Sequence, residues 1–344
     1  GSLMSAVADS GEVKVEGQFV GRLDGFRFQA DHTDGVNAAR AVASAAQRAL
    51  KQEITSRVTQ VAAEPDEAFS LDDGGVILWR GAAVARLIAG PEVLRPAVEL
   101  LPSDLIETAA RDSLHRRLTA WLSGFIGHAL AALFTAREAP LSGAARGLVF
   151  QLGEALGSLP RIGAAQQVAA LSDADRKALA RLGIRLGVES VFLPVLLKPA
   201  AQRLRGLLWT TSHGVPPLPI PPPGRISLVP PEGVPPGYYD AIGYRLLAGR
   251  ALRVDMLERF AAEARHLARH APFIAPPALL GLVSAPPAEA RAMLEALGYR
   301  ATPGETGLTY RPIRKRPTPS HAPRTASTLD AAGPFAALRR LTPA

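Results

Sequence analysis

The stretch Leu171–Trp209, LSDADRKALARLGIRLGVESVFLPVLLKPAAQRLRGLLW, contains the transitions that organise this chain. Ser172 with the aspartates that follow it is typical of a helix start. The β-branched, glycine-bounded run Ile184–Leu193 predicts a strand or an extended arm. Pro199 suits the first turn of the basic helix that follows. The stretch therefore predicts the end of a helical region, an extended crossing, and a new helix.

The charge balance changes within the same stretch. Residues 1–197 hold 20 Lys and Arg against 22 Asp and Glu, a net charge of −2. Residues 198–344 hold 19 against 9, a net charge of +10, so the two parts give the total of +8. A strongly basic half indicates anionic partners, with nucleic acid first and a membrane surface second.

Length and composition limit the class of protein. A chain of 344 residues predicts two or three domains. Aromatic residues make up only 6% while Ala and Leu dominate, which favours helices. The absence of cysteine excludes disulfides and thiolate metal sites, and it fits a cytoplasmic protein. Apolar runs such as Val191–Leu197 are far shorter than the roughly 20 residues of a membrane span, so no segment is expected to span a membrane, and no membrane is counted among the expected partners.

The N-terminal third predicts a small α+β domain. Residues 1–12 are interpreted as a tag remnant, because of Gly1 and Ser2, followed by disordered residues. Within residues 13–101, alternating apolar residues at 13–30 predict a glycine-punctuated hairpin, and the Ala-rich segment 36–62 predicts a helix. Residues 69–87 return to strand character. We expect a β-α-β layer in which strands from both sides of the helix share one sheet.

Residues 102–214 predict a helical bundle with an extended arm. Helical spacing of apolar residues covers 104–137, and shorter helices are expected at 142–156, 162–171 and 173–182. Residues 215–236 contain ten prolines in 22 positions. This composition predicts a polyproline-like linker, or a strap that lies extended over the surface.

Residues 237–313 predict three helices followed by a hairpin. The helices are expected at 254–271, 276–284 and 286–297, and the hairpin at 298–312. This is the order of a winged helix-turn-helix, although a miscellaneous three-helix cap is an equal alternative. Residues 314–344 are interpreted as a basic flexible tail in which Phe335–Leu341 can dock as a short helix. The expected fold class is α+β, mostly α.

Motifs for catalysis are not found in this sequence. There is no G-x-x-x-x-G-K-[ST] phosphate loop and no G-x-S-x-G nucleophile turn. Glu263, His266 and His270 are spaced to share one helix face, but no H-E-x-x-H accompanies them and arginines flank them. A polar helix face is therefore the favoured interpretation. No cofactor and no metal are expected in this chain.

The basic residues carry the functional signal, because arginine forks bind phosphates in a bidentate manner. The segment expected to be the recognition helix of a winged helix carries Glu289 and Glu295 with only Arg291, which suits a major groove poorly. Contact through the hairpin and the tail is therefore favoured. The expected nucleic-acid contacts are Arg203, Arg205, Arg245, Arg250, Arg253, Arg300, Arg311, Arg314, Lys315 and Arg316.

Three stretches resemble one family. They are DADRKALARLGIRLGVESVFLP with LKPA in residues 173–200, VEGQFVGRLDGFRF in residues 15–28, and YYDAIGYR with RVDMLER in residues 238–259. These stretches resemble the region C-terminal to the motor in alphaproteobacterial superfamily 2 helicase-related proteins, which are similar to the mitochondrial degradosome RNA helicase. The resemblance covers most of residues 13–300 and includes no catalytic motif.

The resemblance implies an accessory C-terminal region of an ATP-dependent helicase, without catalysis of its own. ATP and Mg would belong to the motor domains, which would be partners in cis. RNA or single-stranded DNA would be the nucleic-acid partner, and a ribonuclease is a possible protein partner. The alternative from another class is a protein-interaction scaffold whose basic surface meets an acidic partner.

Overall fold

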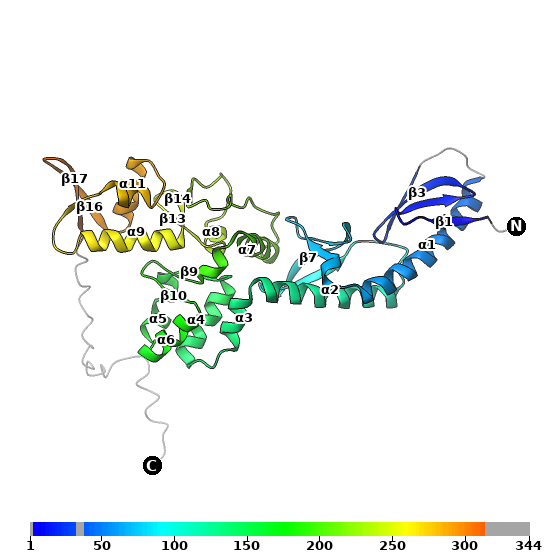
Figure 1. The fold of residues 1–344 in the computed structure, drawn as a ribbon, viewed down its shortest axis with the longest axis horizontal. Coiled ribbons are helices and arrows are strands. Elements are labelled where there is room, and N and C mark those ends of the chain that lie inside the picture. Colours follow the sequence, from blue (N-terminus) through cyan, green and yellow to red (C-terminus); the bar gives the residue numbers. More distant parts are fainter. Residues whose placement is uncertain (1–2, 32–37, 314–344) are drawn as a thin grey trace, which may run out of the picture.

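A computed structural model describes residues 3–31 and 38–313 of the chain. The fold class is α+β, because helices alternate with small antiparallel sheets of three or four strands. The described part of the molecule is elongated (Figure 1). A four-stranded sheet lies at the end that holds the N-terminus, and the hairpin of β16 (Tyr299–Gly304) and β17 (Gly307–Pro312) lies at the opposite end (Figure 1). Gly1 and Ser2, which were interpreted as a tag remnant, and the tail 314–344 lie outside the described residues.

Two four-stranded sheets, each followed by a helix, form the N-terminal part. The expectation of one shared sheet is wrong, because each set of strands pairs only within itself, in the orders β1-β2-β3-β4 and β5-β6-β7-β8. The disorder expected before residue 13 is also wrong for residues 3–12, since they supply β1 and the start of β2. The bounds are β1 Ser5–Val7, β2 Glu12–Val15, β3 Gln18–Asp24, β4 Arg27–Ala30, α1 Ala38–Ala63, β5 Phe69–Leu71, β6 Val76–Trp79, β7 Ala82–Glu92, β8 Arg95–Leu100 and α2 Thr108–Ala129.

The two sheets are copies of one module. Val13 pairs with Gly21 in the first sheet and Ile77 with Ala85 in the second, so equivalent residues differ by 64 in number. The same difference relates every pair of β1 with β2 to a pair of β5 with β6. The bulge falls at the same place in both copies. The sequence G-x-x-V-x-R-L occurs at residues 17–23 and again at 81–87.

The loops of the two copies also coincide. The amide of Leu23 donates to the carbonyl of Gly11 at 2.7 Å, and the amide of Leu87 donates to that of Gly75 at 2.8 Å. Glu16 (φ 50°) and Arg80 (φ 47°) both adopt the left-handed conformation that is uncommon for side chains other than glycine. A match of pairing, bulge, loop bonds and backbone angles shows an internal repeat of sheet and helix.

The copies differ where the second one meets the rest of the molecule. In the β3–β4 hairpin the paired residues Gly21 and Ala30 are nine positions apart in sequence. In the β7–β8 hairpin the equivalent pair, Ala85 and Leu100, is fifteen positions apart. The extra residues reach the bundle, where the Glu92 carboxylate lies 3.6 Å from the guanidinium of Arg137. The longer hairpin therefore attaches the second copy to the bundle.

The bundle follows the second copy. The single helix expected over 104–137 is wrong, because α2 and α3 (Ala131–Glu138) meet at a bend of 87°. Among the described residues no single helix is long and apolar enough to cross a membrane, and by length and composition only this bent pair passes. The elements that follow are α4 Gly143–Glu154, β9 Ser158–Pro160, α5 Ala165–Ala169, α6 Asp173–Arg181, β10 Arg185–Leu186, β11 Ser190–Phe192 and α7 Pro199–Ser212.

The stretch 171–209 folds largely as its pattern predicts. Ser172 accepts from the amide of Asp175 while the Asp175 carboxylate accepts from the amide of Ser172, a complete capping box. The expected arm at 184–193 forms β10 and β11, which make a three-stranded sheet with β9 in the order β10-β11-β9. Pro199 begins α7 as expected.

The proline-rich segment packs against the body as a strap. The hydroxyl of Tyr238 donates to the carbonyls of Leu218 (3.2 Å) and Pro219 (3.3 Å), and Leu218 and Ile220 pack on a core that includes buried Tyr238. Within this segment β12 (Ser227–Leu228) pairs with β14, so that the sheet order is β12-β14-β13. The neighbouring elements are α8 Pro236–Ala241, β13 Tyr244–Leu247 and β14 Arg250–Arg253.

The C-terminal unit contains the expected helices and hairpin. They are α9 Val254–Leu267, α10 Pro277–Gly281, α11 Pro287–Ala296, β16 Tyr299–Gly304 and β17 Gly307–Pro312. A further short strand, β15 (Phe273–Ile274), was not expected, and it pairs with β17 to give the order β15-β17-β16. The unit has its own apolar core, which includes Leu257, Phe260, Leu279 and Met293.

One carboxylate joins the bundle to the C-terminal unit. Glu258 of α9 accepts hydrogen bonds from three consecutive backbone amides of the β10–β11 turn. The distances are 2.9 Å from Val188, 2.7 Å from Glu189 and 2.7 Å from Ser190. Hydrogen bonds to an ionised acceptor are stronger than neutral ones, so this Glu258 clamp fixes α9 against the bundle.

Candidate nucleic-acid interface

Two arginines face each other on the hairpin of the C-terminal unit. Arg300 of β16 lies directly opposite Arg311 of β17 in the register. Side chains alternate across a strand, and the neighbours Tyr299 and Tyr310 are buried against the core. Arg300 and Arg311 therefore share the other face of the sheet, where both are exposed.

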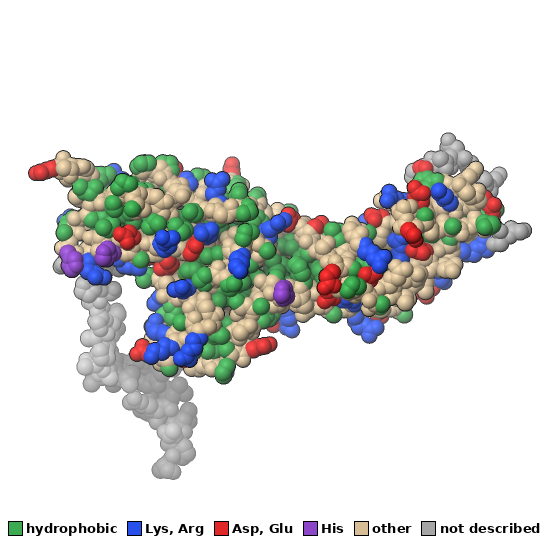
Figure 2. All heavy atoms as spheres, viewed as in Figure 1, with side chains coloured by type: hydrophobic (Ala, Val, Ile, Leu, Met, Phe, Trp, Pro, Cys, Tyr) green, Lys and Arg blue, Asp and Glu red, His purple; other side chains and the backbone are tan. Residues whose placement is uncertain are grey.

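These arginines line a hollow of about 600 Å³ together with Arg269 and His270, which follow the end of α9. Within residues 3–31 and 38–313, no carboxylate oxygen lies within 4.0 Å of a guanidinium nitrogen of Arg269, Arg300 or Arg311. Histidine and basic side chains lie together at the end of the molecule where α9 ends (Figure 2). We call this group of four residues the basic hollow.

The electrostatics of the basic hollow favour an anion. Like charges directly opposite each other on neighbouring strands are destabilising. The C-terminal end of α9 offsets part of the positive charge of Arg269, because a helix dipole is negative there. That offset does not reach the cross-strand pair itself. A bound phosphate would remove the repulsion between Arg300 and Arg311 and accept from both forks.

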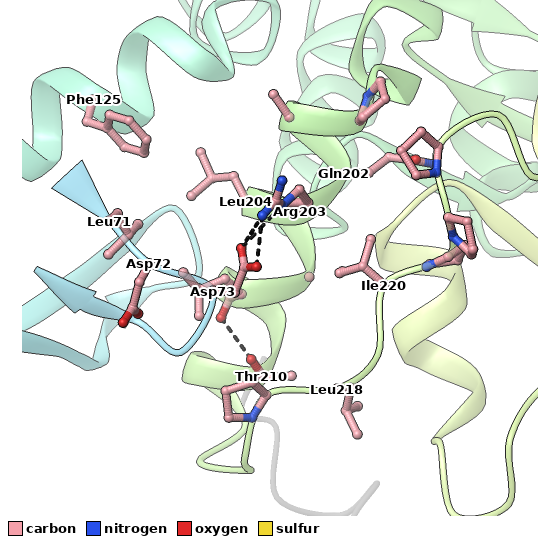
Figure 3. Close-up of a pocket in the computed structure, with 18 residues that line it drawn as sticks. Leu71, Asp72, Asp73, Phe125, Gln202, Arg203, Leu204, Thr210, Leu218 and Ile220 are labelled. Atoms are coloured by element: carbon pink, nitrogen blue, oxygen red, sulfur yellow. Dashed lines mark hydrogen bonds and ion pairs between the residues drawn. The ribbon is translucent and has the colours of Figure 1, made fainter.

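Arg203 is exposed on α7 but already has a partner. Its guanidinium meets the Asp73 carboxylate in three contacts of 2.8 to 3.2 Å, across 130 positions of sequence. The pair crosses a groove of about 670 Å³ between α7, the β5–β6 turn and the strap. In Figure 3, Leu218 and Ile220 of the strap form the opposite wall of the groove.

Arg250 and Arg253 are also neutralised within the fold. Arg250 donates to the Glu289 carboxylate at 2.6 Å and to the Ser227 hydroxyl at 2.7 Å. Arg253 makes a two-pronged pair with Asp255 at 2.7 and 2.9 Å. Both arginines are only partly exposed. Arg250 thus joins the strap to α11, and Arg253 pairs locally with the first turn of α9, so neither charge is available as a free phosphate fork.

Arg205 is buried, which overturns its assignment as a nucleic-acid contact. The side chain is 0% exposed, and its guanidinium donates to the carbonyl of Leu196 (2.9 Å) and the hydroxyl of Ser158 (2.7 Å). Burial lowers the pKa of Arg205 to about 9, so the group is still a cation at neutral pH. Its role is to join the bundle from inside, without reaching the surface.

Arg245 is partly buried. One of its terminal nitrogens is buried without a hydrogen-bond partner among the described residues. Its charge lies near Asp240, whose pKa is raised by burial and lowered to a smaller extent by Arg245. Arg245 is partly exposed, but with one terminal nitrogen buried it does not present both tips of its fork to a polyanion. Arg314, Lys315 and Arg316 lie outside the described residues.

The possible metal ligands do not gather on one face. α9 ends at Leu267, so His270 lies beyond the helix that carries Glu263 and His266. Within the ranges that the structure describes, no group of three or more His, Asp or Glu residues could hold a metal ion. His270 instead lines the basic hollow.

Sequence reasoning missed two members of the basic hollow, Arg269 and His270. Their signal is the basic end of the helix, RHLARH at residues 265–270, although this pattern by itself predicts only a polar helix face. The expectation that α11 is a poor reader of nucleic acid fits its ion pairs. Arg291 pairs with Glu295 at 3.1 Å, and Glu289 is occupied by Arg250.

Comparisons with protein-family models, with curated proteins and with solved structures gave no match to this chain. The geometry of the basic hollow and the fold of the C-terminal unit therefore carry the functional argument.

Proposed function

We propose that this chain is an accessory, non-catalytic region of a nucleic-acid helicase that binds the phosphate backbone of a single strand through the basic hollow. The observation that carries this proposal is the cross-strand pair Arg300 and Arg311, which shares its hollow with Arg269 and His270. The net charge of +10 after residue 197 supports an anionic partner. The helicase assignment rests on the family resemblance of the three sequence stretches.

The arrangement of the C-terminal unit supports a winged-helix interpretation. Its order is α9, β15, α10, α11, β16 and β17, and β17 lies between β15 and β16. This matches a helix-turn-helix with a two-stranded wing. On this interpretation the wing and the end of α9 contact phosphates, while α11, whose charges are paired, does not read bases.

Salt dependence tests the proposal. The full chain is titrated into fluorescein-labelled single-stranded RNA and DNA at 50 to 200 mM salt, and binding is followed by anisotropy. The slope of log K against log salt is negative, and each lost phosphate contact makes it less steep by about 0.7 for a single strand. The double variant Arg300→Ala/Arg311→Ala should therefore make it less steep by about 1.4. All sequences should be affected similarly, because phosphates carry no base identity.

A matched control removes the same charge elsewhere. The double variant Arg86→Ala/Arg95→Ala also deletes two exposed arginines, but these are paired with Glu99 and Glu92 on the second sheet. Its salt slope should equal that of the parent chain. An equal loss in both double variants would mean that only net charge matters and would remove the basic hollow from the argument. No binding at 50 mM salt would leave the scaffold for an acidic protein as the better interpretation.

A further inference from the structure

A second hollow lies on the other side of the C-terminal unit, and it is apolar. It has a volume of about 600 Å³ and lies between α10, α11, β15 and β17. Ile274 in its wall is 49% exposed, which is unusual for an isoleucine next to a core. The apolar wall is formed by Ile274, Leu280, Ala288, Ala292, Leu308 and Tyr310.

The rim of this apolar groove carries an ion pair, because Arg291 lines it beside Glu295 and contacts one oxygen of that carboxylate. The Glu295 carboxylate lines it and is 45% exposed while it pairs with Arg291. An apolar channel of this kind with a charged rim suits a short amphipathic helix that places side chains at i and i+3 into it. A basic residue on the flank of such a helix would bind the second carboxylate oxygen of Glu295, which has no hydrogen bond or ion pair within the described residues.

One segment of the same chain has this pattern. Residues 334–341 read PFAALRRL, which puts Phe335, Leu338 and Leu341 three positions apart. Pro334 suits the first turn of a helix. The arginines at 339 and 340 supply the complementary charge. The rest of the chain after residue 313 has no comparable run of apolar residues at helical spacing.

The chain also leaves the described part at a suitable place. Leu308 and Tyr310 of β17 line the apolar groove, and Ile313 follows directly after that strand. The distance back from Ile313 to Leu308 is about 17 Å at 3.4 Å per residue. A flexible chain of 20 residues, the number from 314 to 333, has a root-mean-square end-to-end distance of about 25 Å, which is enough to cover that distance. Tethering at this length gives a millimolar effective concentration.

We infer that residues 334–341 bind in the apolar groove of their own chain. The groove accepts Phe335 and Leu338, and the basic flank lies toward Glu295. This contact is independent of the proposed nucleic-acid function, because the apolar groove and the basic hollow share none of their lining residues. It returns residues 314–333, which include Arg314, to the side of the C-terminal unit.

Spin-label distances in the full chain test the inference, and the absence of cysteine makes labelling specific. Labels are placed on Glu305→Cys in the β16–β17 turn and Thr342→Cys after the segment, and their separation is measured by pulsed electron resonance. A narrow distance distribution is expected. Phe335→Ser/Leu338→Ser should make it broad, whereas the matched control Leu329→Ser, a leucine of the same tail, should leave it narrow.

The groove side provides a second, independent variant. Ile274→Ser should broaden the distribution, and Ile162→Ser, at an isoleucine that is 81% exposed elsewhere, should not. A broad distribution in the parent chain would overturn the inference. A narrow distance that appears only between two singly labelled chains would also overturn it, because the segment would then bind a second copy.

Discussion

Replacing Glu258 with alanine should release the β10–β11 turn from α9. The carboxylate accepts from the amides of Val188, Glu189 and Ser190, and the latter two bonds, both 2.7 Å, are the less exposed. A hydrogen bond to a charged group contributes about 1.5 to 3 kcal/mol. Two such bonds at the lower value give about 3 kcal/mol for local opening. Glu258→Gln keeps one acceptor oxygen without the charge, and about half of this loss is expected.

Amide hydrogen exchange measures this opening directly. A loss of about 3 kcal/mol corresponds to roughly 100-fold faster exchange at residues 188–190, since 1.4 kcal/mol is a factor of ten. Glu263→Ala on the same helix is the control, because Glu263 is exposed and makes no hydrogen bond or ion pair with the part of the chain that the structure describes. Exchange in Glu258→Ala within threefold of the parent chain would refute the clamp as the element that protects these amides.

Three further outcomes follow from the structure. Gly17→Ala and Gly81→Ala, at φ 79° and 82° with open space around each, should each lower the free energy of unfolding in urea by about 1 kcal/mol. The control Gly124→Ala inside α2 should raise it by about 1 kcal/mol. A clear difference between the first two variants would argue against the repeat. Arg205→Lys keeps the charge but not the fork, so about 2 kcal/mol should be lost, and a cost below 0.5 kcal/mol would contradict the role of its two hydrogen bonds. Burial raises the pKa of all five tyrosines, so the folded state favours their neutral form. The free energy of unfolding should therefore fall as pH rises above 10. Absorbance at 295 nm should show the tyrosines ionising together with unfolding, not before it.

Local signals predicted much of the secondary structure. Ser172 and Pro199 mark helix starts that the structure contains, because capping and the fixed φ of proline act over a few residues. The bend after Ala129 had no local signal, since no proline or capping residue stands there. It arises where α3 turns away to pack on α4, which is a tertiary effect.

The repeat was missed because few identities carry it. Within the two G-x-x-V-x-R-L sequences the residues at the x positions differ, and the property that the two copies share is a pattern of burial and turn geometry. At a shift of 64 the two G-x-x-V-x-R-L sequences align, and the strand register shows that this alignment is structural. Without it, the strands before and after α1 were placed in one sheet.

The candidate interface was predicted as a region, but its residues were not separated from structural arginines. Arg203 forms an ion pair with Asp73, which is 130 positions away in sequence, and Arg250 forms one with Glu289, which is 39 positions away. Such partners are set by the folded arrangement, so the count of basic residues near a segment overstates its free charge. Arg300 and Arg311 could be separated only through the strand register that places them opposite each other.

The two copies of the sheet-and-helix module should differ in how well they tolerate amino-acid substitutions. The second copy is constrained by the bundle through its longer hairpin and by α7 through Asp73, so substitutions there disturb several neighbours at once. The first copy projects at the end of the molecule, and its sheet packs mainly on its own helix (Figure 1). Selection can therefore reshape the outer surface of the first copy, while the second preserves the architecture.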